Sequence, residues 1–151
     1  AALRAASAAL DSLRACGDIR GFADCARVGV RAACITEDFD AAKRLADQSL
    51  GHCVRLGSQC GEASMRLAMA EVRYADQGPK QATDLAAQAV ALFASAGDAR
   101  RQGIACVVLS RLHVAAGDAG QAADFAEQAH ALFESVGDPW GRAHACAALA
   151  D

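Results

Sequence analysis

The chain has 151 residues, of which 54% are hydrophobic, 22% charged and only 5% aromatic, and its formal net charge is −3. This length accommodates one ordinary domain, and the lack of a basic block argues against direct binding of nucleic acid. No apolar run is long enough to span a membrane. With 40 alanines and only two prolines, the composition favours helices over strands.

A period of forty residues organises the chain. Glycines recur at this spacing, and each is followed by a short polar residue: Gly17-Asp18, Gly57-Ser58, Gly97-Asp98 and Gly137-Asp138. Residues 57–96 and 97–136 share 12 identical residues over 40 aligned positions. We therefore divide the single predicted domain into a half-repeat (1–16), three repeats (17–56, 57–96 and 97–136) and a second half-repeat (137–151).

Each repeat predicts two helices. The glycine of the repeated pair takes the left-handed conformation that ends one helix, and the polar residue after it caps the next. A second break falls near Glu37-Asp38, Gly78-Pro79 and Gly117-Asp118. We expect the first helix of each repeat (the A helix) over 19–36, 59–76, 99–116 and 139–150. The second (the B helix) is expected over 39–56, 79–96 and 119–136, and residues 1–16 follow the B pattern.

The hydrophobic patterns of the two helix types differ. The B helices are amphipathic, with apolar residues such as Ala82, Leu85 and Ala89 at helical spacing. The A helices are apolar on most sides, so each must lie between its own B helix and the neighbouring repeat. Small residues that allow close helix contact recur at Ala42, Ala46, Ala82, Ala86, Ala122 and Ala126. The predicted fold class is all-α, an α-solenoid of antiparallel helix pairs.

These columns resemble the tetratricopeptide repeat (TPR). In that motif a small residue opens the B helix and an alanine follows seven positions later, as at Ala82 and Ala89, and a large apolar residue precedes a small one midway along the A helix, as at Leu109-Ser110. The period here is 40 instead of about 34, and the usual closing proline is absent. The longer form, with ends such as Phe133–Gly137-Asp138, resembles the repeats of large bacterial regulators, including the maltose-activator class of ATP-binding transcription factors.

The resemblance implies a right-handed superhelix whose A helices line a concave groove, and a regulatory module that binds a protein partner there. By alignment of the repeat columns, the groove candidates are Asp24, Arg27, Arg31, Ser64, Leu67, Glu71, Tyr74, Ile104, Val107, Arg111 and His144. An apolar centre combined with arginine and tyrosine suits a peptide or helix ligand. The alternatives are an effector-sensing domain for a small molecule, which such a superhelix can hold, and a scaffold for an enzyme assembly.

One column of the repeat alternates in charge along successive A helices: Arg31, Glu71, Arg111 and Asp151. Two interpretations stay open. The arginines could form a pair that binds an anion or a peptide terminus. Alternatively, the column could be a ladder of ion pairs between repeats that fixes how they stack.

The sequence carries no recognisable catalytic or cofactor motif. It has no phosphate-binding glycine loop, no nucleophile elbow and no Cys/His spacing typical of zinc, and its four histidines fall on different predicted helices. We therefore expect a non-enzymatic protein without cofactor or metal. The seven cysteines fall mostly at apolar helix positions, Cys16 among them, which predicts free structural thiols and a reducing, cytoplasmic location.

The two half-repeats predict that the sequence is a piece of a longer protein. Apolar positions of the last helix, Cys146 among them, have no predicted partner beyond them. Because the half-repeats are complementary, we expect head-to-tail self-association, with a two-fold dimer of the terminal A helices as the alternative. Trp140 is available to either contact.

Overall fold

A computed structural model of the protein describes the backbone of residues 2–150 and the side chains of residues 4–148. Within the described residues the protein is all-α, as predicted, and contains no strand. The elements are α1 (Ala2–Cys16), α2 (Ile19–Ile35), α3 (Phe39–Arg55), α4 (Gln59–Gln77), the 3₁₀ turn η1 (Pro79–Gln81), α5 (Thr83–Ser95), α6 (Ala99–Ala116), α7 (Ala119–Ser135) and α8 (Pro139–Ala150). None of these helices, over their described residues, is both long and apolar enough to cross a membrane.

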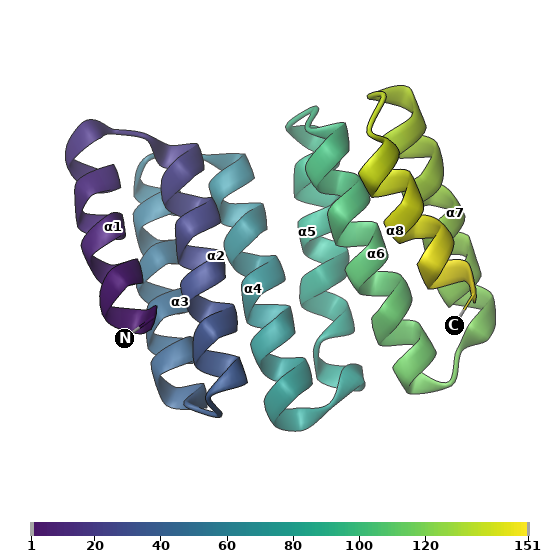
Figure 1. Ribbon diagram of the computed structural model, residues 1–151, viewed down its shortest axis with the longest axis horizontal. Coiled ribbons are helices and arrows are strands. Elements are labelled where there is room, and N and C mark those ends of the chain that lie inside the picture. Colours follow the sequence, from purple (N-terminus) through teal and green to yellow (C-terminus); the bar gives the residue numbers. More distant parts are fainter. Residues whose placement is uncertain (1, 151) are drawn as a thin grey trace.

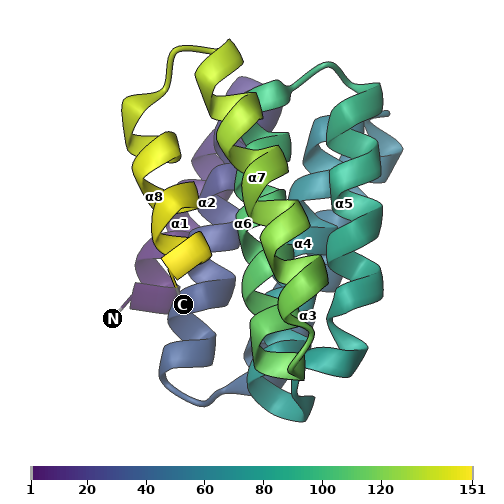
Figure 2. The ribbon, with the colours of Figure 1, turned by 90° about the vertical axis from the view of Figure 1, so that its right-hand side faces the viewer.

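The helices stand side by side in chain order, joined by short turns at alternate ends (Figure 1), and each packs on the next along the sequence. The A helices α2, α4, α6 and α8 lie toward the viewer in Figure 1, in front of the B helices α3, α5 and α7. Figure 2 shows that the row is curved. The side that faces the viewer in Figure 1 is at the left of Figure 2, and α2 and α8 lie closer to it than α4 and α5. The A helices therefore share the hollow side of the molecule.

Contacts within the A-helix layer are uneven. Helix α2 packs against α4, and α6 packs against α8. Helices α4 and α6 meet instead through η1 and through side chains around Leu67 and Leu109. The A-helix layer is therefore most widely spaced between α4 and α6, at the middle of the hollow side.

The predicted turns set most of the helix boundaries. Gly17, Gly57, Gly97 and Gly137 all have positive φ angles, between 64° and 73°. The polar residue after each of them accepts a hydrogen bond from the backbone N–H three positions later, as Asp98 does from Arg101 at 3.0 Å. The predicted starts of these helices are confirmed.

One predicted helix start is wrong. Helix α5 begins at Thr83, and residues 79–81 form a 3₁₀ turn instead of its first turn. The other B helices have an aspartate cap, Asp38 or Asp118, whereas Gly78 has no side chain that could accept from the helix N–H groups. The chain therefore enters this helix through a tighter turn that starts with Pro79.

The close helix contacts are built on alanine. The six alanines predicted to allow close approach are all at most 3% exposed. Larger side chains fill the space between successive repeats at the column of Cys53, Phe93 and Phe133, each buried. Gly141 lies against the Phe133 ring so closely that an added Cβ atom would overlap it. Small and large residues thus alternate across the helix contacts, as close packing requires.

The cysteines are free in the described structure, and Cys16 is more exposed than predicted. Cys53 and Cys106 are buried, and Cys25, Cys34 and Cys60 are half-buried. Cys16 and Cys146 are exposed, because each lies on the outer side of a terminal helix that packs on one side only. Burial raises the pKa of the Cys106 thiol to about 12 and also raises that of Cys53.

A thiol reagent at neutral pH should therefore label two cysteines, Cys16 and Cys146, much faster than the other five. The buried thiols combine poor access with a low thiolate fraction, since their pKa values are raised. Mass spectrometry over a time course measures the rates, with labelling in denaturant as the control for the total of seven. Rapid labelling of four or more would contradict the packing of the A and B helices.

The left-handed turn residues make a second prediction. Gly97 has a φ of 70° and an added Cβ would meet no neighbour within 4 Å, so Gly97→Val tests backbone conformation alone. It should destabilise the protein by about 2 kcal/mol. Glu37, the one described non-glycine residue with positive φ (58°), provides the converse variant, since Glu37→Gly should stabilise by about 0.5–1 kcal/mol. Urea unfolding measures both, and equal stability of the two variants would contradict the turn assignment.

Two buried serines make a third prediction. The Ser49 hydroxyl is buried without a hydrogen-bond partner, whereas Ser110 donates to the Ala122 carbonyl at 2.8 Å. Ser49→Ala should therefore stabilise the protein by about 1 kcal/mol, and Ser110→Ala should destabilise it by a similar amount. The corresponding residues of the next two repeats, Ala89 and Ala129, already carry the smaller side chain at the Ser49 column. Opposite signs in urea unfolding are the expected result, and destabilisation by both variants would contradict it.

Candidate functional site

The hollow side of the molecule contains a pocket of about 420 Å³ between α2 and α4 on one side and α6 and α8 on the other. We call it the concave pocket. Seven predicted groove residues line it: Arg27, Arg31, Glu71, Ile104, Val107, Arg111 and His144. The other lining residues are Arg100, Val108, Phe133, Asp138, Trp140 and Gly141. The repeat columns therefore place most of the wall correctly, although the chain segments that form it lie far apart in sequence.

A second hollow of about 310 Å³ adjoins the concave pocket. It is lined by Tyr74, Arg111, Val114, Ala115 and Ala148. Arg111 borders both hollows, so they lie next to each other along α6, and we call the two together the trough. Along α6 its lining extends from Arg100 to Ala115, a length of about 22 Å at the rise of an α-helix.

The floor of the concave pocket is apolar. Ile104, Val107 and Val108 come from one stripe of α6, and Phe133 comes from α7. Trp140, at the start of α8, adds an indole that is 79% exposed to solvent. Trp140 is also the only tryptophan of the sequence. A large apolar side chain exposed at the edge of a depression is typical of a binding surface.

Two ion pairs cross the walls of the pocket. A guanidinium nitrogen of Arg27 lies 2.8 Å from a carboxylate oxygen of Glu71, joining α2 to α4. Nε of Arg100 lies 2.9 Å from the carboxylate of Asp138, the cap of α8. Hydrogen bonds from the Gly141 backbone N–H and from Arg100 lower the pKa of Asp138, so its carboxylate stays ionised at neutral pH.

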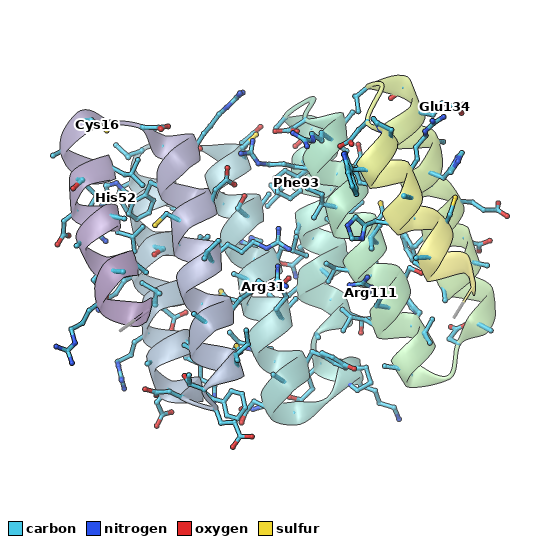
Figure 3. All side chains as sticks on the ribbon, viewed as in Figure 1. Cys16, Arg31, His52, Phe93, Arg111 and Glu134 are labelled. Atoms are coloured by element: carbon cyan, nitrogen blue, oxygen red, sulfur yellow. The ribbon has the colours of Figure 1, made fainter. Side chains whose placement is uncertain are left out.

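Arg31 and Arg111 form no ion pair with any described residue. They line the same pocket from α2 and α6 and lie at similar heights along these helices (Figure 3). The pocket wall thus holds four arginines and two carboxylates, which leaves two positive charges in excess. The pocket wall is therefore positively charged, although the whole chain has a net charge of −3.

The predicted ion ladder does not form between Arg31, Glu71 and Arg111. Glu71 pairs instead with Arg27, one helical turn before Arg31 on α2. Arg31 and Arg111 are left without this partner. Asp151, the last member of the column, lies outside the described residues.

Asp24 does not line the trough and has a positioning role instead. Its carboxylate lies 2.7 Å from the Arg101 guanidinium, an ion pair between α2 and α6 that joins residues 77 positions apart in sequence. Arg101 also contacts Asp98, the cap of its own helix, at 2.9 Å. Burial alone would raise the pKa of Asp98, but the hydrogen bonds from Arg101 lower it overall. These charges hold α2 and α6 together near their N-terminal ends.

Two other predicted groove residues are not available to a ligand. Leu67 is fully buried and Ser64 is 4% exposed, because α4 is set back in the row and its neighbours cover this part of its surface. The prediction is wrong for both as contact residues. Leu67 instead belongs to the core shared by α4, α5 and α6. Tyr74, one turn beyond Glu71, is 47% exposed and lines the lower end of the trough.

Sequence reasoning missed six residues of the concave pocket, and a helical signal was present for three of them. Arg100 and Val108 lie four residues before and after Ile104, so they share its stripe on α6. Trp140 likewise lies four residues before His144 and shares its stripe on α8. Phe133 near the end of α7, Asp138 in the turn after it and Gly141 at the start of α8 are the other three, and no periodic pattern indicated that this region borders the pocket.

The described part of the chain holds no group of three or more His, Cys, Asp or Glu side chains arranged to bind a metal ion. No protein-family model matches the sequence, and no curated protein is significantly similar to it.

Proposed function

We propose that this protein is a TPR-like α-solenoid that binds a segment of another polypeptide in the trough. The observation that carries the proposal is that two hollows lie next to each other along α6, the larger one with an apolar floor and charged walls. The trough length of about 22 Å matches about six residues of extended chain or about four turns of helix. Peptide recognition by repeat proteins uses extended concave surfaces of this shape.

Several features support the TPR-like part of the proposal. The forty-residue period coincides with the alternation of A and B helices, and the glycine–polar turns recur at the same place in each repeat. Alanine columns mediate the close helix contacts. The resemblance to bacterial regulators suggests a module that reports occupancy of the trough to another domain, with no catalytic step of its own.

A small-molecule sensor is the second candidate. The volume of the concave pocket, about 420 Å³, is within the range typical of small-ligand sites. A small ligand is favoured by an enclosed site, however, and this pocket has a second hollow beside it at Arg111 and exposes most of Trp140. The open, elongated shape favours a polypeptide ligand.

The proposal is tested by selecting peptides from a displayed random library on the folded protein. Selected peptides should change the fluorescence of Trp140, the single tryptophan. Removing the exposed rings at the two ends of the trough, in the double variant Tyr74→Ala/Trp140→Ala, should weaken binding of a labelled peptide at least about tenfold. Both side chains are exposed, so this variant should keep the stability of the parent protein.

The matched control is Val54→Ala, which truncates an exposed apolar side chain of α3 that does not line the trough. Its peptide affinity should equal that of the parent protein. Peptides that bind with equal affinity to the parent, the double variant and the control would place the binding surface elsewhere and overturn the proposal. Binding of small molecules to the concave pocket in place of any peptide would favour the sensor.

A further inference from the structure

We propose that the segment held in the trough is acidic, with an internal glutamate or aspartate side chain between Arg31 and Arg111 and a large apolar residue packed on Trp140. This inference rests on the proposed function and deepens it, because it assigns the chemical character of the partner. Arg31 and Arg111 are then the residues that determine specificity.

The charge balance of the pocket is the first argument. The two carboxylates in its lining, Glu71 and Asp138, each already bind an arginine. Arg31 and Arg111 have no such partner among the described residues, and an overall acidic chain holds these two positive charges beside an apolar floor. A ligand carboxylate would complete the set of ion pairs in the pocket.

The position of the two arginines is the second argument. Arg111 borders both hollows, so it lies at the middle of the trough and not at one end. Arg31 lines the concave pocket from α2, across from α6. A chain that runs along the trough therefore passes the arginines with an internal residue. A guanidinium presents parallel N–H donors that suit a carboxylate better than a neutral amide.

The Arg27–Glu71 pair gives the third argument. It is made through one nitrogen and one oxygen, and Nε of Arg27 and the second carboxylate oxygen of Glu71 are both buried without a hydrogen-bond partner. Buried polar atoms of this kind are costly when they stay unpaired. Both residues line the concave pocket together with Arg31 and Arg111, and Arg27 lies one helical turn before Arg31 on α2. Since both atoms are buried, they pair with a bound peptide only if the Arg27 and Glu71 side chains move toward it on binding.

Trp140 supplies the apolar half of the specificity. Its indole is 79% exposed beside Ile104 and Val108, and Arg100 and Asp138 neutralise each other next to it. The upper end of the pocket therefore presents a ring without net charge, while the middle presents two free guanidinium groups. A leucine or phenylalanine close to the acidic residue would bury this indole and exclude water from the ion pairs.

The test uses synthetic peptides of about twelve residues, acetylated and amidated so that they carry no terminal charge. One peptide holds two adjacent glutamates between a leucine and a phenylalanine, and its partner has glutamines in their place. A third peptide has the glutamines and a free C-terminal carboxylate. Binding to the folded protein is measured by the fluorescence of Trp140 and by calorimetry.

The glutamate peptide should bind about tenfold more tightly than the glutamine peptide, and added salt should reduce this difference. Arg31→Gln and Arg111→Gln should each remove most of the difference, because the glutamine peptide carries no charge for either arginine to pair with. The control Arg44→Gln makes the same change of charge at an exposed arginine of α3 outside the trough and should have no effect.

Equal affinity for the glutamate and glutamine peptides, with both lost in Tyr74→Ala/Trp140→Ala, would overturn this inference and leave the proposed function intact. A second result would also overturn it: only the peptide with a free C-terminus binds more tightly than the amidated glutamine peptide, and Arg31→Gln removes this gain. The arginines would then recognise the end of a chain. If library selection yields no peptide that depends on Tyr74 or Trp140, the proposed function itself fails.

Discussion

The structure depends on one local constraint, the turn that ends a helix with a left-handed residue and starts the next with a side-chain cap. At Gly97-Asp98 the N–H of Asp98 donates to the Phe93 carbonyl at 3.0 Å, while the Asp98 carboxylate accepts from the N–H of Arg101. The same turn thus satisfies polar groups of both helices and leaves them to pack side by side. Its recurrence every forty residues gives the chain its alternation of A and B helices.

Close packing of the helices then determines where the hollow side lies. The alanine columns bring each B helix against its A helices, so the apolar residues of the A helices divide between the core and the trough. Because α4 and α6 are the least tightly joined A helices, the depression opens between them. The Asp24–Arg101 ion pair limits this opening near the N-terminal ends of α2 and α6. Shape and charge of the trough therefore follow from how the repeats stack.

The proposed binding role uses features that the core does not need. Trp140 is exposed, Arg31 and Arg111 pair with no carboxylate in the described part of the chain, and the Arg27–Glu71 pair keeps a buried donor and a buried acceptor without partners. Each of these costs the isolated protein some stability or solubility. Their gathering in one depression is the physical reason to interpret the trough as a surface completed by a partner.

The sequence by itself determined the helices, their caps and the buried alanine columns, because glycine, aspartate and the spacing of apolar residues act within a few residues along the chain. It also placed seven of the pocket residues, since a column of the repeat recurs at one position around each A helix. Only the tertiary structure decided that Glu71 pairs with Arg27, that Leu67 and Ser64 are buried, and that the start of α8 brings Trp140 to the pocket. Periodicity fixes the direction of a side chain around its own helix, but the offset and spacing of neighbouring helices come from packing summed over the whole contact, which no single column of the sequence records.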